Sequence, residues 1–258
     1  MFVEARGVNV HYEQSGRQGP DVLLLHGWGC DISLWRPIIE RLSQRCRVTT
    51  LDFPGHGGSE RPPEPWDAKA FAAMTAEFIE KLGIAGCCVI GHSHGGRVAL
   101  RLALDRPELI GKLILTGSAG LRSKPTLKRR ARSVLYKILR GTLDGLEKLR
   151  IFGGMPERAR AALRGAFGSA DYKALDEDMR RTFVLLVNTN LEPELPNVRA
   201  STLLLWGDKD TETPLWMGRL MAERIPDAGL VVLEGGSHFA YIEQPDRFCR
   251  IAARFILD

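Results

Sequence analysis

The chain has 258 residues, of which 44% are hydrophobic and 26% are charged, and its formal net charge is +5. This length and composition fit one globular domain, and no apolar stretch reaches the length of a transmembrane helix, so we expect no stable membrane insertion. The first residues lack a basic region followed by an apolar run, and the five cysteines lack metal-ligand spacing. We therefore expect a cytoplasmic protein without a signal peptide, whose cysteines are reduced.

Short apolar segments bounded by glycine and polar residues predict eight strands, in chain order over residues 2–5, 8–12, 22–25, 47–51, 87–90, 109–116, 202–206 and 230–233. Apolar residues at helical spacing predict helices over residues 32–42, 68–82, up to about 104 after the fifth strand, 215–224 and 245–256. Regular alternation of strand and helix is typical of a mostly parallel sheet with helices on both faces. The sequence thus predicts an α/β fold with an eight-stranded, mostly parallel sheet.

The alternation is interrupted between residues 119 and 199, where little resembles a strand. One face of a predicted helix carries apolar residues at helical spacing, namely Leu127, Ala131, Val134, Leu135, Ile138 and Leu139, and a further helical pattern covers residues 179–187. We expect residues 119–199 to form a helical cap inserted into a core domain of residues 1–118 and 200–258. A cap over the carboxyl ends of the strands would wall the pocket where α/β sheets bind ligands.

The most informative motif is Gly91-His92-Ser93-His94-Gly95, which follows the fifth predicted strand and precedes a helix. A serine squeezed between a strand end and a helix start has a strained backbone, and the residues two before and two after it must be small for the turn to close. Such a turn presents the serine hydroxyl at its tip as a nucleophile elbow. Ser93 is therefore the candidate nucleophile.

A serine hydroxyl is a poor nucleophile until a positioned imidazole can take its proton, which directs attention to the six histidines. His11 has no motif around it, and we expect the side chains of His92 and His94 to point away from Ser93. His238 follows the last predicted strand in a loop that contains two glycines, and such a loop can carry the ring toward the serine. We predict that His238 is the base.

Three further motifs accompany the elbow: His26-Gly27-Trp28-Gly29, the turn at residues 52–57 that contains His56, and the loop that begins Gly207-Asp208-Lys209-Asp210. With them the whole chain resembles the capped serine hydrolases of the alpha/beta-hydrolase family. The resemblance implies that Asp210 is the acid, since the family places it between the serine and the histidine. Asp208 and Glu212 compete with it, and we interpret both as parts of a solvated turn.

The family also implies an oxyanion hole, which stabilises charge on the substrate carbonyl oxygen with preset donors. By resemblance the donors are the backbone N–H groups of Trp28 and His94, in a loop that His26 shapes. The side chain of Trp28 fits a core aromatic as well. Nothing in the sequence suggests a phosphate loop or a metal site, so we expect no cofactor and no metal.

The mechanism that the resemblance implies is acyl transfer, in which Ser93 attacks a carbonyl, His238 shuttles the proton, Asp210 orients His238 and water releases the acyl group. We expect a carboxylic ester hydrolase for a small or medium acyl substrate. One alternative is a carbon–carbon bond hydrolase of the ring-cleavage-product type with the same triad, and another is a ligand receptor that retains the fold. A serine at the elbow argues against haloalkane dehalogenases and epoxide hydrolases, which need an aspartate there.

The charge is unevenly distributed, because residues 121–166 contain thirteen lysines and arginines against three acidic residues. Such a segment favours a substrate with a carboxylate or phosphate, or attracts the cap to an anionic membrane surface, although charged runs usually face water. No interleaved aromatics or reader motif predict nucleic-acid binding. The expected partner is a small-molecule acyl substrate, with an anionic one left open, and the sequence predicts no particular oligomeric state.

Overall fold

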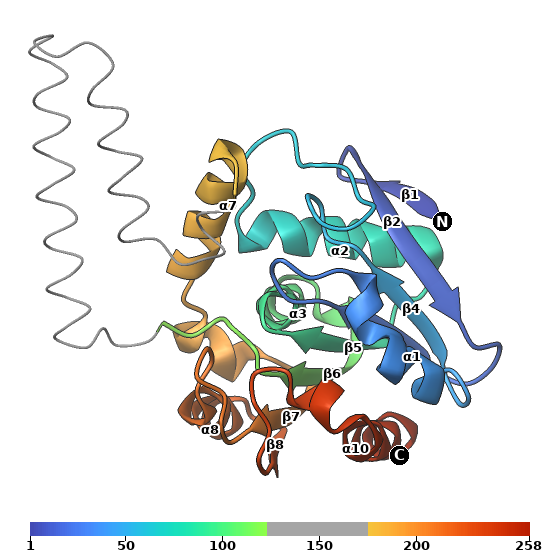
Figure 1. Cartoon of the computed structure of the whole chain (residues 1–258), viewed down its shortest axis with the longest axis vertical. Helices are drawn as coiled ribbons and strands as arrows, with labels where there is room; N and C mark the ends of the chain where they lie inside the picture. Colours follow the sequence, from blue (N-terminus) through green and yellow to red (C-terminus); the bar gives the residue numbers. More distant parts are fainter. Residues whose placement is uncertain (123–174) are drawn as a thin grey trace, which may run out of the picture. The chain divides into compact units, whose positions relative to one another are not determined.

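The computed structural model describes residues 1–122 and 175–258, and eight strands of this part form one sheet (Figure 1). The strands are Phe2–Ala5 (β1), Val8–Ser15 (β2), Asp21–Leu25 (β3), Arg47–Leu51 (β4), Cys87–His92 (β5), Ile110–Thr116 (β6), Ser201–Gly207 (β7) and Ala228–Leu233 (β8). Their order across the sheet is β1-β2-β4-β3-β5-β6-β7-β8. Two strand pairs are antiparallel, β1 with β2 and β2 with β4, and the other five are parallel, so the predicted eight-stranded, mostly parallel sheet is confirmed.

Helices connect the strands. The described ones are α1 (Arg36–Leu42), α2 (Ala68–Leu82), α3 (His94–Asp105), α7 (Glu177–Asn188), α8 (Leu215–Arg224), α9 (Ala240–Glu243) and α10 (Pro245–Leu257), with short 3₁₀ helices at Ile32–Trp35 (η1), Pro107–Leu109 (η2) and Glu192–Asn197 (η3). The helix predicted over residues 32–42 is divided between η1 and α1. Pro37 near the start of α1 has no amide hydrogen for an α-helical bond back to Ser33, so the α-helix cannot continue unbroken through it.

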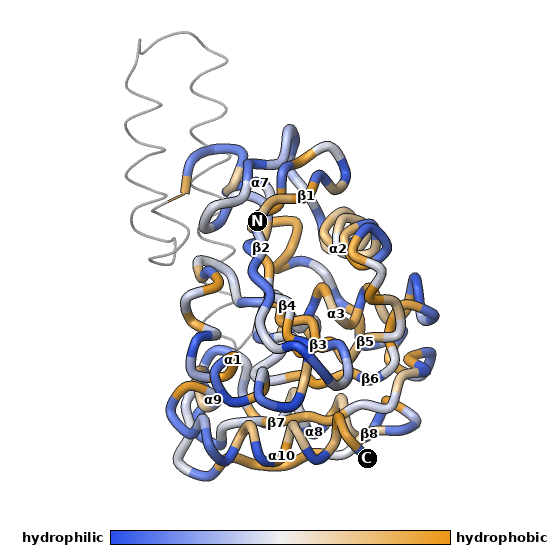
Figure 2. The backbone as a smooth tube through the Cα atoms, turned by 90° about the vertical axis from the view of Figure 1, so that its right-hand side faces the viewer, coloured by the Kyte–Doolittle hydropathy of each residue, from blue (hydrophilic) through white to orange (hydrophobic). Residues whose placement is uncertain are grey.

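Both faces of the sheet are buried, as the continuous apolar strands predict. Alternate residues of β3 divide between two apolar layers: Leu23 and Leu25 belong to one, and Val22 and Leu24 to the other. Residues of α2, α3 and α8 cover the first layer, and residues of α1 and α10 cover the second. Figure 2 shows apolar residues concentrated along the central strands. This double cover leaves the ends of the strands as the places where polar groups gather.

Contacts along the chain define two compact units, Met1–Arg122 with Val184–Asp258, and Ser123–Phe183. The predicted apolar helix face between Leu127 and Leu139 lies outside the described residues, and the cap predicted over residues 119–199 stays a prediction. Within the described part of that interval, α7 matches the helical pattern predicted over residues 179–187, and none of these residues belongs to a strand.

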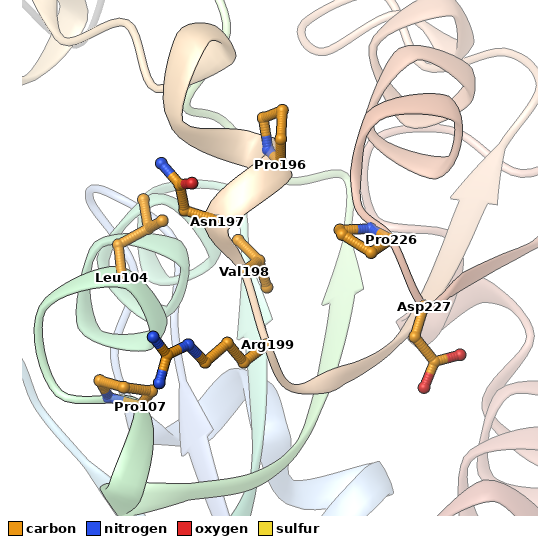
Figure 3. A pocket seen from close by; sticks show the side chains of 8 residues that line it. All are labelled: Leu104, Pro107, Pro196, Asn197, Val198, Arg199, Pro226 and Asp227. Carbon is orange, nitrogen blue, oxygen red and sulfur yellow. The ribbon is translucent and has the colours of Figure 1, made fainter.

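The two ends of the parallel strands differ, and we call them the carboxyl edge and the amino edge of the sheet. The loops that follow β5, β6, β7 and β8 leave the sheet at its carboxyl edge, because these strands are parallel neighbours. A cavity of about 530 Å³ lies at the opposite, amino edge, where Pro107, Arg199 and Asp227 precede the strands (Figure 3). The sequence motifs all belong to the carboxyl edge, so that edge holds the candidate site.

Candidate active site

Ser93 lies at the tip of the turn between β5 and α3, with a backbone that a residue other than glycine rarely adopts. Its φ is 51° and its ψ is −110°, and a conformation of this kind costs about 1–3 kcal/mol. Three backbone hydrogen bonds hold it: Ser93 N–H donates to Thr116 O at 3.2 Å, and Ser93 O accepts from Arg97 N at 3.1 Å and from Ala119 N at 3.0 Å. The surrounding chain therefore maintains the strain that presents the hydroxyl.

The glycines on either side of the elbow are required by close packing of the backbone. A Cβ on Gly91 would lie 2.6 Å from Gly95 O, and a Cβ on Gly95 would lie 2.1 Å from Leu25 O. Both distances are far below van der Waals contact with backbone atoms that cannot move aside. The turn thus needs the small residues that the sequence argument assigned to these two positions.

His238 and Asp210, which are 28 residues apart in the sequence, form a buried pair. His238 Nδ1 lies 2.9 Å from Asp210 Oδ2, and Thr213 Oγ1 donates to the same carboxylate oxygen at 2.8 Å. Burial raises the pKa of Asp210, but the hydrogen bonds from His238 and Thr213 outweigh this and leave its pKa below the ordinary value. The ionised carboxylate holds the proton of the neutral imidazole on Nδ1, which leaves Nε2 as the basic nitrogen.

Asp208 and Glu212, the two competing acids, are exposed in the turn after β7, as predicted, and each also makes a contact with another loop. Asp208 Oδ1 accepts a hydrogen bond from Gly235 N at 2.6 Å and so ties the loop after β7 to the loop after β8. Glu212 Oε2 lies 3.5 Å from His238 Nε2, although its side chain is 65% exposed. Only the meeting of two distant loops creates these contacts, so local sequence could not indicate them.

One turn after β6 brings the elbow and the acid–base pair together. Thr116 and Ala119 bond the backbone of Ser93, and between them Gly117 adopts a φ of 47°. A Cβ on Gly117 would lie 3.1 Å from Asp210 Oδ2 and 3.2 Å from His238 Nδ1. The three predicted triad residues therefore surround this turn. Ser93 and His238 are not hydrogen-bonded to each other, and the Nε2 edge of the ring faces Glu212.

His92 contacts the predicted base, His238. No sequence motif indicated this contact. The ring centroid of His92 lies 4.7 Å from that of His238, and its Nε2–H donates to the backbone oxygen of His238 at 3.0 Å. Burial lowers the pKa of His92 to about 3, so its ring is neutral and places no positive charge beside the base. His92 thus helps to hold the loop that carries His238.

His94 begins α3 directly after Ser93, so its backbone N–H has no acceptor within the helix. Its ring packs between Phe53 and Phe71, with centroid distances of 5.0 and 4.9 Å. Neither ring nitrogen has a hydrogen-bond partner in the described part of the chain. Burial, and then the nearby charge of Arg97, lower the pKa of His94 well below its ordinary value, so the ring behaves as a neutral aromatic group.

The loop after β3 lies against the elbow. His26 shapes it, because its Nδ1–H donates to Gly27 O at 2.7 Å and its Nε2 accepts from Phe53 N at 2.9 Å. A Cβ on Gly27 would lie 3.4 Å from Ser93 Cβ, so this loop passes directly beside the serine. Trp28 follows on the same loop, and its ring contacts that of His94 at 5.6 Å. Both predicted oxyanion residues therefore lie next to Ser93.

Two further properties of the described residues bear on the site. No group of three or more histidine, cysteine, aspartate or glutamate side chains in residues 1–122 and 175–258 is arranged to hold a metal ion. None of the helices in the same ranges combines the length and the apolar character needed to cross a membrane.

Residues 22–251 match a model of the alpha/beta hydrolase family. The chain therefore belongs to this family. This alpha/beta hydrolase is 30% identical over 268 residues to the pimeloyl-acyl-carrier-protein methyl ester esterase of Aeromonas hydrophila, a match that covers 96% of this chain and 100% of the relative. The crystal structure of the enol-lactonase from Burkholderia xenovorans LB400 covers 100% of both chains at 25% identity, with a TM-score of 0.76. The meta-cleavage product hydrolase from Pseudomonas fluorescens IP01 shares the fold at 24% identity and a TM-score of 0.74, over 99% of this chain and 96% of that one.

Proposed function

We propose that this hydrolase cleaves carboxylic esters of small or medium acyl groups, with Ser93 as nucleophile, His238 as base and Asp210 as the acid that orients it. The observation that carries the proposal is the turn at Gly117, which bonds the strained elbow on one side and contacts the Asp210–His238 pair on the other. The names of two similar proteins, a methyl ester esterase and an enol-lactonase, support ester cleavage.

In the acylation step, Ser93 Oγ attacks the ester carbonyl carbon while His238 Nε2 takes the hydroxyl proton. The carbonyl oxygen becomes an oxyanion and accepts hydrogen bonds from the backbone N–H groups of His94 and Trp28. Collapse of the tetrahedral intermediate breaks the carbon–oxygen bond, and His238 gives its proton to the departing alcohol. Asp210 stabilises the imidazolium during this step and keeps the ring oriented.

In the deacylation step, His238 takes a proton from water, which attacks the acyl group on Ser93. The second tetrahedral intermediate collapses to the carboxylic acid, and His238 returns the proton to Ser93 Oγ. Both steps need Nε2 to face the serine, so Glu212 must leave Nε2 when a substrate enters. Its exposed side chain allows that movement. In this proposal residues 119–199 form a cap that selects the acyl group.

The test is hydrolysis of p-nitrophenyl esters of graded acyl length by the whole chain and by Ser93→Ala. We expect Ser93→Ala to lower kcat by about 10⁴-fold or more, because the covalent step is lost while substrate binding remains. Ser201→Ala is the matched control, since Ser201 begins β7 at the amino edge and bonds Asp227. The control should keep full activity.

Three results would overturn the proposal. Equal activity of Ser93→Ala and the unmodified chain would remove Ser93 as nucleophile. Cleavage of vinylogous diketones without any cleavage of esters would replace the ester bond by a carbon–carbon bond. Tight retention of a ligand with a single very slow turnover would indicate a receptor that keeps the hydrolase fold.

A further inference from the structure

Arg97 is a buried cation that the described chain does not neutralise. It lies one helical turn after Ser93 on the same side of α3, it is only 9% exposed, and its Nε is buried without a hydrogen-bond partner. No carboxylate in residues 1–122 or 175–258 forms an ion pair with it. Its position in the first turns of α3 adds to the cost, because the amino-terminal end of a helix carries positive partial charge.

Arg101, one turn further along α3, is also buried, but it is paired with two carboxylates. Its Nη1 donates to both carboxylate oxygens of Glu194, at 2.8 and 2.9 Å, and its Nη2 donates to Asp105 at 2.6 Å. Burial lowers the pKa of Arg101, but the two carboxylates outweigh this and raise it. Burial alone acts on Arg97 and lowers its pKa to about 10. Among the residues that the structure describes, carboxylates thus pair with Arg101 and none pairs with Arg97.

Helix geometry and the electrostatic effect of Arg97 on His94 both favour a side chain that extends toward the candidate active site. Side chains on an α-helix tilt toward its amino terminus, which in α3 is the end that carries Ser93. The charge of Arg97 is the second cause, after burial, of the lowered pKa of His94, so the guanidinium lies near the ring that follows Ser93. A Cβ on Gly120 would lie 4.0 Å from the Cα of Arg97, so this side of the helix faces the segment that leaves the turn at Gly117.

We propose that Arg97 binds a carboxylate on the acyl part of the substrate, so that the preferred substrates are monoesters of short dicarboxylic acids. A guanidinium presents its N–H donors in a planar fork that matches a carboxylate, and a bound carboxylate supplies the missing counter-charge. One helical turn rises about 5.4 Å, so a short diacid chain can reach from the carbonyl at Ser93 to Arg97. This inference rests on the proposed ester hydrolysis and narrows its substrate class.

The first experiment measures kcat and KM for monomethyl succinate, glutarate and adipate, with the dimethyl esters of the same acids as neutral partners. We expect Arg97→Gln to lower kcat/KM for the monomethyl esters by about 10- to 100-fold, mainly through KM, because a charge-assisted hydrogen bond is lost. The dimethyl esters should be unaffected, and Arg97→Lys should keep part of the preference. Arg199→Gln, at the amino edge, is the matched control and should behave like the unmodified chain.

The controls separate binding from a structural role. An equal loss for mono- and dimethyl esters in Arg97→Gln would assign Arg97 to folding and overturn the proposal, as would no loss for either. Thermal unfolding gives a second reading: removal of an uncompensated buried cation should leave Tm unchanged or raise it, whereas a marked fall would again indicate a structural role.

Failure of the proposed function is distinguishable from failure of this inference. Cleavage of dimethyl esters that depends on Ser93, without any preference for monomethyl esters, would overturn the Arg97 proposal alone. Binding of glutarate to Ser93→Ala, measured by calorimetry and lost in Ser93→Ala with Arg97→Gln, would support the carboxylate site even if no ester is cleaved. Competition by inorganic phosphate but not by glutarate would overturn the carboxylate assignment.

Discussion

The two edges of the parallel sheet distribute their polar groups in opposite ways. At the amino edge the acidic side chains have polar partners: Asp21 at the start of β3 accepts two hydrogen bonds from Arg47 at the start of β4, at 2.6 and 2.8 Å, and Asp227 before β8 accepts one from the hydroxyl of Ser201. At the carboxyl edge Ser93 is strained, and buried nitrogens of His94 and Arg97 have no hydrogen-bond partner in the described chain. Unfavourable groups are thus concentrated where the proposed chemistry occurs.

The same strands thus close the fold at the amino edge and hold the candidate site at the carboxyl edge. The amino edge closes the fold with satisfied polar groups and a cavity whose lining brings no acid–base pair together (Figure 3). The carboxyl edge tolerates strain and desolvation because the rigid strands behind it over-determine the geometry. Substitutions at the carboxyl edge should therefore change activity more than stability, and those at the amino edge should leave activity unchanged.

The largest expected effect beyond loss of the nucleophile is that of Asp210→Asn. An asparagine can present its amide to His238 Nδ1 and so favours the wrong tautomer, which should lower kcat by about 10⁴-fold. The measurement is steady-state ester hydrolysis, with circular dichroism to establish that the variant folds. Asp208→Asn is the control, because its side-chain oxygen can still accept from Gly235. A greater loss in Asp208→Asn than in Asp210→Asn would reverse the assignment of the acid.

An intermediate effect concerns acid stability. The pKa of His92 is lowered to about 3 and that of His26 to about 4, and the pKa of His94 also lies well below its ordinary value. In the unfolded chain these histidines take up protons near pH 6.5, whereas the folded chain does not. Proton uptake by the unfolded chain therefore lowers the free energy of unfolding as the pH falls from about 6.5 toward 4, and it has no effect above pH 6.5.

His94→Phe tests this prediction within the same cluster. It keeps the backbone N–H and an aromatic ring between Phe53 and Phe71 while removing two unpartnered nitrogens. We expect a gain of about 1–2 kcal/mol in the free energy of unfolding at pH 7.5 and a larger gain at pH 5, since the variant has one protonation site fewer in the unfolded state. Urea unfolding at the two pH values measures both. A loss of stability that is equal at the two values would show that the imidazole itself contributes to packing.

The smallest expected effect is at the amino edge. Asp227→Ala removes a side chain of the cavity and its bond to Ser201, so it should cost about 1 kcal/mol of stability or less. Its kcat/KM for esters should equal that of the unmodified chain. Parallel thermal unfolding and ester hydrolysis provide the check. A tenfold fall in kcat/KM would show that a residue of the amino edge affects catalysis, and it would contradict the difference between the two edges.

Local patterns in the sequence determined most of the fold. Strand and helix positions follow from apolar periodicity within about ten residues, and the predicted ranges 47–51, 68–82 and 215–224 agree with β4, α2 and α8 at both ends. Departures occur where local geometry outweighs periodicity. Pro37 divides the first predicted helix, and the four residues of α9 are too few to show a period.

The sequence by itself also marked the elbow, because glycine spacing around Ser93 is a local requirement, and family order then singled out Asp210 and His238. Only the tertiary structure decided which side chains meet. His92 bonds His238 across 146 residues, and Glu212 reaches the same ring from another loop. That no carboxylate of residues 1–122 or 175–258 pairs with Arg97 could not be read from the sequence either, since Arg101 on the same helix pairs with two. Such contacts depend on strand order and loop approach, which bring together residues that no local pattern relates.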